Sequence, residues 1–311
     1  MDVKRFRWVQ LVSITVAAVA IASLYGAQAR AQDLEPRAYS AAPVGTNFLI
    51  VDYSHSSGNS GVDPSFPIQD LHATIDVVKL GYSHTFDLAG RMASYAMLLP
   101  AARGFISGIV STQNTQVTRS GHGDFGVRVV VNLKGCPALT PAQFARRKPT
   151  TVVGASLIVI APTGAYDSAH FFNVGTNRWS LRPEVGVEQP MGKWFVDGAT
   201  GVWLYTVNHD FFHGNVLSQN PIPELQVHTG YNFRPGQWLA ADANYYGGGK
   251  TSLNGTPTSV TFANSRYGLT FAQPFGQGFA AKLAWSKWLG GTFRNKYNTF
   301  ELALQYRWFD R

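Results

Sequence analysis

The 311-residue sequence predicts an all-β fold, a transmembrane antiparallel up-and-down β-barrel of about 12 strands. Apolar and polar residues alternate with period two along most of the chain, as in strands that have two different faces. Tight turns and long polar loops also alternate, as in barrels with short periplasmic turns and longer extracellular loops. Charged residues make up only 14% of the chain, whereas an average soluble domain has about a quarter.

The first 31 residues have the pattern of a secretory signal peptide. A basic start precedes an apolar run over 9–24, and small-x-small sequences end at Ala31. A membrane anchor is the alternative, but the run is shorter than the ~20 residues that a spanning helix needs. We therefore expect cleavage after Ala31 and export to the bacterial outer membrane, with an N-terminal periplasmic segment at 32–45 and a barrel at 46–311.

The strands follow from the alternation, taken in order along the chain. In the final one, Phe300, Leu302 and Leu304 share one face, whereas Glu301 and Gln305 share the other. Similar segments give an even number of strands, as single-chain bacterial barrels require. The predicted strands are 46–55, 72–86, 91–105, 123–133, 151–162, 178–189, 193–206, 222–233, 237–247, 259–273, 278–288 and 297–309.

The connections alternate between tight turns, such as Met191–Gly192, and long loops. One connection on the short-turn side is itself long, Gly135–Thr150, and we expect a brief helix over 139–147 within it. Pro183 falls inside a predicted strand; because proline cannot donate to the ladder, we expect a local bulge there. The long loops are 56–70, 111–124, 167–177, 208–221, 248–258 and 290–296.

The polar face separates a membrane barrel from a soluble β-sandwich or barrel, which is the alternative fold. A soluble barrel turns its apolar face inward and its charged face to water. Here the polar face carries both signs in similar numbers, which suits a lumen where charges pair and an apolar face that meets lipid. By parity, the predicted lumen-lining residues are Arg128, Arg182, Glu184, Glu188, Asp197, Glu224, Asp242, Arg266, Lys282, Glu301 and Arg307.

Tyrosine and tryptophan recur near the strand ends, where membrane barrels carry interfacial girdles of aromatic side chains. Phe195 and Trp203 are assigned to the face opposite Asp197. The girdle candidates are Tyr53, Tyr82, Trp179, Trp194, Trp203, Tyr205, Trp238, Tyr245, Trp285, Trp288, Tyr306 and Trp308.

Charge and motifs argue against other classes of function. Without the signal peptide, 22 Lys and Arg stand against 17 Asp and Glu, a net charge of +5, and no basic run indicates a nucleic-acid partner. The single cysteine, Cys136, cannot form an internal disulfide. His209 and His213 are four residues apart but lie in a predicted loop, so we predict no metal site.

The letters DFG at Asp124–Gly126 lack the companion kinase motifs and mark the start of a strand. The sequence contains no GxSxG elbow, P-loop or CxxC motif. We therefore predict that the protein is not an enzyme and binds no cofactor. A hydrolase built from scattered Ser, His and Asp on a barrel wall remains an alternative.

The stretch Ala161–Val187 reads APTGAYDSAHFFNVGTNRWSLRPEVGV, a predicted hairpin with its loop at 167–177. Its two ends, together with Gly121–Leu133 and Leu34–Gly58, resemble the family of phenol-degradation meta-pathway transporters. The resemblance extends over nearly the whole mature chain. Members are exported barrels, often encoded near genes of aromatic catabolism, so the resemblance implies passage of hydrophobic, often aromatic, compounds through the outer membrane.

The expected function is therefore a passive outer-membrane channel for small hydrophobic ligands. Phe171, Phe172, Phe211 and Phe212 could form an apolar contact site at the outer face, or could simply pack the loops. The expected partners are outer-membrane lipid, lipopolysaccharide and the barrel-assembly machinery, which would recognise the aromatic C-terminal strand. A closed barrel with a structural or surface-binding role is the alternative.

Overall fold

The computed structural model of the protein describes residues 34–60, 68–110, 113–257, 262–291 and 296–310. The predicted signal peptide, 1–31, lies outside these residues. Among the described helices, none has the length and apolar character needed to cross a membrane.

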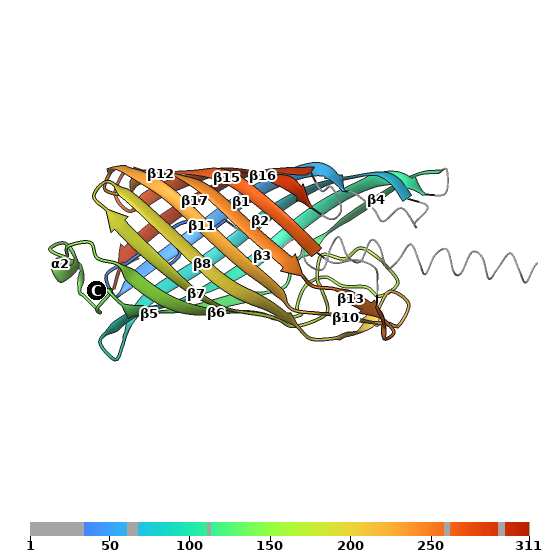
Figure 1. Cartoon of the computed structure of the whole chain (residues 1–311), viewed down its shortest axis with the longest axis horizontal. Coiled ribbons are helices and arrows are strands. Elements are labelled where there is room, and N and C mark those ends of the chain that lie inside the picture. Colours follow the sequence, from blue (N-terminus) through green and yellow to red (C-terminus); the bar gives the residue numbers. More distant parts are fainter. Residues whose placement is uncertain (1–33, 61–67, 111–112, 258–261, 292–295, 311) are drawn as a thin grey trace, which may run out of the picture.

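Over the described residues, twelve antiparallel strands close into a barrel, which confirms the predicted fold class (Figure 1). The ring closes where β1 pairs with β17, with Thr46 opposite Phe309, and where β2 pairs with both β1 and β3. The strands of the ring are β1 (Thr46–Ser60), β2 (Ile68–Leu88), β3 (Arg91–Val110), β5 (Gly126–Lys134), β6 (Val152–Ile160), β7 (Ser180–Met191), β8 (Trp194–Tyr205), β11 (Ile222–Arg234), β12 (Gln237–Gly248), β15 (Phe262–Phe275), β16 (Phe279–Gly291) and β17 (Lys296–Phe309).

Three of the predicted long loops contain strands of their own. Gln113–His122 forms β4, which pairs with the outer part of β3 and carries that hairpin beyond the rest of the barrel. A separate small sheet at the same end joins β9 (Asn208–Phe211), β10 (Asn215–Gln219), β13 (Thr251–Leu253) and β14 (Thr256–Pro257). These polar hairpins lack the long alternation that identified the barrel strands, so periodicity did not find them.

The ladder beside β3 is interrupted between β4 and β5. β3 pairs with β4 as far as Ala101 opposite His122, and with β5 only from Leu98 opposite Gly126 onward. Residues 123–125 between them are not in a strand, although the predicted strand began at 123. The backbone therefore leaves the wall at Asp124, whose side chain is buried.

Two local predictions had different outcomes. The short helix expected over 139–147 is present as α2 (Pro141–Phe144), and Thr140 and Gln143 form a capping box at its start. The prediction of a bulge at Pro183 was wrong. β7 keeps one register with β6 throughout, and its register with β8 is the same on both sides of Pro183. The chain accommodates the proline by leaving Arg182 and Pro183 out of the ladder with β8.

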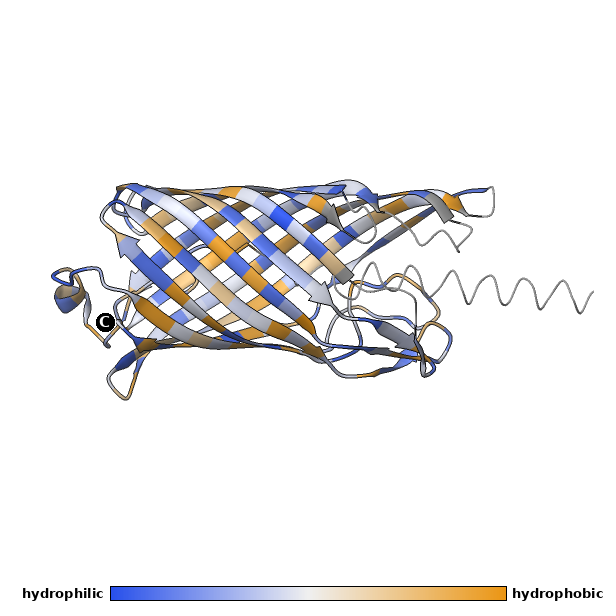
Figure 2. Ribbon diagram, viewed as in Figure 1, coloured by the Kyte–Doolittle hydropathy of each residue, from blue (hydrophilic) through white to orange (hydrophobic). Residues whose placement is uncertain are grey.

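The two strand faces differ in what they contact. Large apolar side chains are exposed on the outside, including Leu49, Val227 and Leu302, whereas charged side chains are buried inside. Figure 2 shows hydrophobic and hydrophilic residues following one another along the strands. On β7, Val185 is 53% exposed while its neighbour Glu184 is 6% exposed. This inversion of the soluble pattern is the one that a membrane requires.

Some predicted girdle aromatics lie elsewhere. Trp203 and Trp288 are almost completely buried inside the barrel, as is Phe195. Asp197 is buried on the same face as Phe195 and Trp203, so their assignment to opposite faces was wrong: 195, 197 and 203 are all odd positions of β8 and share a face. Exposed aromatics such as Trp194 do lie at strand ends.

The register can be checked by thiol labelling in a Cys136→Ser background. We expect Val185→Cys to react with a lipophilic maleimide but to resist a charged thiosulfonate reagent, because its side chain faces lipid. Arg307→Cys, at an exposed position near the end of β17, should react with both reagents. Equal reaction of the two variants with the charged reagent would place Val185 in water and overturn the register.

Candidate functional site

The N-terminal segment enters the barrel. Residues 32–45 were expected in the periplasm, and 32 and 33 lie outside the described residues. From residue 34 on, Leu34 and Tyr39 are buried, and Arg37 and Tyr39 bond to inward-facing side chains. Val44 and Gly45 then connect the segment to β1 at the short-turn end, where the Gly45 N–H donates to the Thr85 carbonyl. The segment therefore occupies part of the lumen from its periplasmic side.

Tyr39 is held in a seat formed by two glycines. Gly154 on β6 lies opposite Gly186 on β7, and a Cβ on either would lie 2.3 or 2.2 Å from the Tyr39 ring. The Tyr39 hydroxyl donates to Glu184 Oε1 at 2.8 Å and lies 3.1 Å from Ser156 Oγ. Because only glycine leaves this space, the wall is shaped to receive the ring.

Arg37 fixes the segment nearer the periplasmic end. Its backbone N–H donates to Asp197 Oδ2 at 3.1 Å, and its guanidinium donates to Asn232 Oδ1 at 2.8 Å. The guanidinium also lies 4.8 Å from the centre of the Phe195 ring. These contacts hold the segment by its backbone, by hydrogen bonds of the guanidinium and by a cation–π contact.

Behind Asp197 lies a chain of buried polar groups. His228 is 2.7 Å from Asp242 Oδ1 through Nδ1 and 3.9 Å from Asp197 Oδ1 through Nε2. Thr270 donates to the other oxygen of Asp242 at 2.6 Å. The residue types resemble those of a hydrolytic triad, but the Thr270 hydroxyl donates to Asp242 rather than to His228. We assign this group of residues a structural role.

Above the segment, a charged layer crosses the lumen. Arg182 is 3.1 Å from Glu224 and 3.2 Å from Glu184, and Arg128 is 2.9 Å from Glu184. Glu35 of the N-terminal segment pairs with Arg128 and so belongs to the same layer. Because these side chains are buried, each has its counter-charge in a neighbouring side chain rather than in water.

The other predicted lumen residues lie around this layer. Lys282 is 3.0 Å from Glu301, Arg266 donates to Ser286 at 2.7 Å, and Glu188 receives a hydrogen bond from Ser40. Arg307 has the inward parity but is exposed near the periplasmic rim, with its guanidinium 5.4 Å from the Phe309 ring. The predicted residues are thus mostly engaged in internal pairs rather than free to bind a solute.

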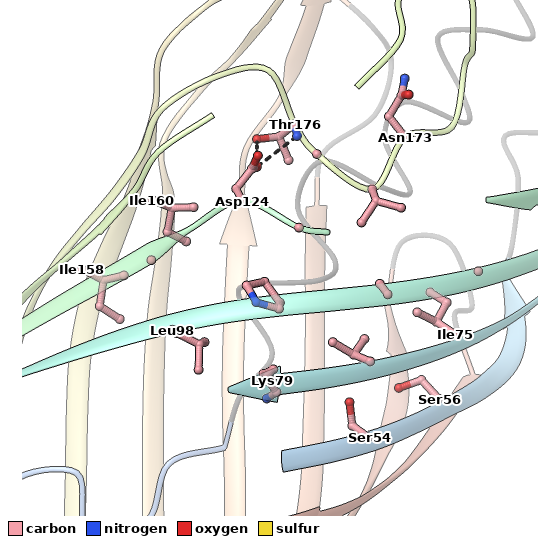
Figure 3. A pocket seen from close by; sticks show the side chains of 18 of the residues that line it. Ser54, Ser56, Ile75, Lys79, Leu98, Asp124, Ile158, Ile160, Asn173 and Thr176 are labelled. Atoms are coloured by element: carbon pink, nitrogen blue, oxygen red, sulfur yellow. Dashed lines mark hydrogen bonds between the residues drawn. The ribbon is translucent and has the colours of Figure 1, made fainter. Parts of the chain in front are cut away.

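A cavity of about 450 Å³ lies between the charged layer and the outer loops. Its lining is mainly apolar and comes largely from β1, β2 and β3, whereas the N-terminal segment packs against the side formed by β5 to β11. Figure 3 shows Ile75, Leu98, Ile158 and Ile160 around this space, with Lys79 on the same wall. Pockets of this size and character hold small ligands.

The cavity also reaches the interruption in the ladder beside β3. Met97 and Val127 have outward-facing parity, yet both contribute to the cavity lining. Gly81 and Gly126, which also line the cavity here, have no side chains to fill it. At this place side chains of outward parity therefore border the cavity.

The loop 161–179 covers the outer end of the cavity and is called its roof below. Asp124 accepts the backbone N–H of Gly164 at 2.7 Å and both the N–H and the hydroxyl of Thr176, at 3.0 and 2.7 Å (Figure 3). Gly164 and Gly175 meet backbone to backbone, since a Cβ on either would lie within 2.7 Å of the other. Asp124, the first residue of the DFG letters, thus holds the roof in place over the cavity.

The predicted outer-loop aromatics gather under this roof. Phe171 packs edge-on against Phe172, Phe211 and Phe212, with ring centres 5.1, 5.7 and 5.2 Å apart. Phe171, Phe172 and Phe211 line the cavity, and Phe212 does not. The cluster packs the loops, as one of the two alternatives expected, and three of its rings also border the cavity. Contact of these rings with a ligand stays a prediction.

Tyr166 links the roof to the small outer sheet. Its hydroxyl donates to the Asp210 carbonyl at 2.9 Å and accepts from Asn208 at 3.1 Å. Burial raises the pKa of Tyr166. His209 and His213 lie in and just after β9, and no group of three His, Cys, Asp or Glu among the described residues is arranged to hold a metal.

Sequence reasoning missed three features of this site. The segment at 34–40 has no periodicity that would place it in the lumen, and Gly154 and Gly186 read as ordinary strand glycines. Trp288 was assigned to the lipid interface because aromatic residues near strand ends usually lie there. For Trp288 a signal was available, since it has the same parity as Lys282, which was assigned to the lumen.

Comparison with known proteins gives one family match. The family described as "Putative MetA-pathway of phenol degradation" matches residues 53–306, from β1 to β17. No curated protein sequence matches the chain.

Solved outer-membrane barrels share the fold. An outer membrane channel from Pseudomonas putida F1 is 24% identical, with a TM-score of 0.77, covering 89% of this chain and 100% of that one. The transport unit of the autotransporter AIDA-I from Escherichia coli is 9% identical, with a TM-score of 0.55 and coverage of 93% and 98%. The translocator domain of NalP from Neisseria meningitidis is 10% identical, with a TM-score of 0.52 and coverage of 87% and 91%.

Proposed function

The chain belongs to the family described as "Putative MetA-pathway of phenol degradation". We propose that it admits small hydrophobic compounds, aromatic ones included, through the outer membrane. The observation that carries this proposal is the cavity beneath the outer loops. It is lined mainly by apolar and aromatic side chains, although it lies in the interior of a membrane barrel whose deeper lumen is charged. A channel for hydrophilic solutes would be expected to have a polar path instead.

The proposed path begins at the roof. A ligand leaving the external medium would meet the Phe171 cluster and then the apolar cavity, where it would lose contact with water. Burial of its apolar surface would provide the affinity, at roughly 25 cal/mol for each Å² removed from water. The charged layer would stop an apolar ligand from diffusing straight down the barrel axis.

One observation favours the alternative, a closed barrel. The N-terminal segment and the charged layer fill the lumen below the cavity. Such a barrel could serve as a structural or ligand-holding surface protein without transport. Uptake distinguishes the two, because a closed barrel would bind a ligand without speeding its entry into cells.

We expect cells that lack the protein to take up a labelled aromatic compound more slowly, at limiting concentration, than complemented cells. Complementation with Gly104→Leu should restore little of the uptake, because a Cβ at Gly104 meets open space and the new side chain enters the cavity. The matched control is Ala101→Leu, an exposed position on the outer face of the same strand. Equal uptake by all strains would refute transport.

The membrane partners follow from the outer surface. Exposed apolar residues on every wall suit outer-membrane lipid, and the polar hairpins beyond β3 and β9 suit lipopolysaccharide. We retain recognition of β17 by the barrel-assembly machinery as a proposal, because this strand ends in exposed Trp308 and Phe309.

A further inference from the structure

The exposed charges of the described residues are divided unequally between the two ends of the barrel. Towards the outer end, three exposed basic residues are balanced by three exposed acidic ones: Arg103, Lys250, Lys296, Asp70, Asp167 and Asp210. At the periplasmic end, where α2 and the C-terminus lie (Figure 1), seven exposed basic residues stand against two exposed carboxylates, those of Asp87 and Asp310. The excess positive charge of the described surface therefore lies at the periplasmic rim.

Six of these seven basic residues lie on one arc of the rim, and the seventh is Arg307. The arc spans strands that are neighbours in the sheet, from β3 through β5, β6, β7 and β8 to β11. None of the six forms an ion pair with a described residue, and Asp87, at the edge of the arc, accepts the Gly90 N–H at 2.7 Å. We call these six residues the basic arc: Arg91, Lys134, Arg146, Lys148, Lys193 and Arg234.

The basic arc directly adjoins the lipid-facing wall. Leu133, Trp194 and Phe233 are 46%, 55% and 50% exposed at the periplasmic ends of their strands. Each is next in sequence to a basic residue of the arc, in the same order Lys134, Lys193 and Arg234. Since one strand residue advances only about 3.3 Å, these charges lie at the edge of the hydrocarbon region, which is the depth of lipid headgroups.

Interfacial aromatic rings mark the same depth. Trp194, Tyr231 and Phe233 form a continuous strip across β8 and β11, with neighbouring ring centres 5.0 and 5.2 Å apart. The ammonium group of Lys193 lies 6.0 Å from the centre of the Tyr231 ring. It therefore stays beside the strip rather than extending into the periplasm. Aromatic strips of this kind lie at the headgroup level, where long basic side chains can reach phosphates.

We propose that the basic arc binds anionic phospholipids of the inner leaflet, with its lysine and arginine side chains donating to headgroup phosphate oxygens. The ligand class is a phospholipid without a positive charge of its own, such as phosphatidylglycerol. A zwitterionic headgroup carries an ammonium group that offsets the attraction, whereas clusters of basic residues beside a membrane span attract anionic lipids. This inference goes beyond the proposed function and is independent of what the cavity holds.

The test is competition between lipids for the barrel surface. The full mature protein is placed in phosphatidylcholine vesicles, and electron paramagnetic resonance measures how strongly spin-labelled phosphatidylglycerol and phosphatidylcholine with the same chains associate with it. We expect the wild-type protein to prefer phosphatidylglycerol by about tenfold. The triple variant Lys134→Gln, Lys193→Gln and Arg234→Gln should lower the preference to about twofold or less.

Two control variants separate the position of the charges from their number and from the shape of the side chains. Lys134→Arg with Lys193→Arg and Arg234→Lys keeps the charges of the arc and should keep the preference. Arg103→Gln with Lys250→Gln and Lys296→Gln removes equal charge towards the outer end, where carboxylates already balance it, and should also keep the preference. If the two glutamine variants lower the preference equally, net charge is responsible and the arc is refuted.

Two further outcomes would overturn the proposal in favour of other partners. A wild-type protein without preference for phosphatidylglycerol would leave the arc to a soluble acidic partner. Loss of the preference when inorganic phosphate is added in excess, at constant ionic strength, would make the arc a site for the free ion. A preference that survives phosphate but weakens in high salt is the result expected for lipid headgroups.

Discussion

Deletion of residues 34–42 is expected to raise the single-channel conductance of the protein severalfold in planar bilayers. The deletion removes Arg37 and Tyr39, which fill the lumen below the charged layer, and Glu35, which belongs to that layer. The retained Pro43 carbonyl still accepts hydrogen bonds from Thr46 and Thr85 at 2.6 and 2.7 Å, so the start of β1 should keep its place. Ions would then meet a wider water-filled path.

The same result should follow, more weakly, from a change in the wall alone. Gly186→Ala places a Cβ 2.2 Å from the Tyr39 ring, so the ring must leave its seat. Val187→Ala, at the adjacent lipid-facing position, is the matched control and should conduct like the wild-type protein. If the deletion and Gly186→Ala both leave conductance unchanged, the segment does not limit the pore.

Arg182→Met is expected to lower the free energy of unfolding by about 3–5 kcal/mol, the usual cost of removing one partner from a buried ion pair. Arg182 is 1% exposed and lies between Glu184 and Glu224, so the variant leaves two buried carboxylates short of a counter-charge. Urea unfolding of the protein in lipid vesicles, followed by tryptophan fluorescence, measures the change.

Two controls sharpen this prediction. Arg307→Met changes an exposed arginine that was also predicted to line the lumen, and should alter stability by no more than about 0.5 kcal/mol. Adding Glu224→Gln to Arg182→Met should recover part of the lost stability, because it removes one uncompensated charge. Equal effects of the two arginine substitutions would show that the charged layer does not stabilise the barrel.

The barrel could be predicted because its pattern repeats. Period-two alternation identifies a strand wherever one face meets lipid, and parity then places charged residues such as Arg182 and Glu224 inside without knowledge of their partners. The same parity applies to inward aromatic positions, since Trp288 shares it with Lys282 and Trp203 with Asp197, but the residue type outweighed parity in the prediction. Trp203 and Trp288 look like interfacial residues by type, and only the apolar character of the upper lumen, which composition does not reveal, explains their place.

The remaining features depend on contacts between distant parts of the chain. Asp124 is 40 residues from Gly164 and 52 from Thr176, so nothing local marks it as the support of the roof. The seat of Tyr39 needs two glycines on two strands to face one ring. Pro183 was misjudged for a different reason: a strand can omit two ladder pairs and keep its register, and sequence does not tell this apart from a bulge.

The position of Tyr39 also constrains the order in which the chain folds. Residues 35–39 form their contacts with side chains 93 to 195 positions further along, on strands that must already stand side by side. Contacts of such long separation form slowly, because the loop between them must first be ordered. The segment that precedes β1 is therefore expected to be among the last to reach its native position, after the wall that receives it has assembled.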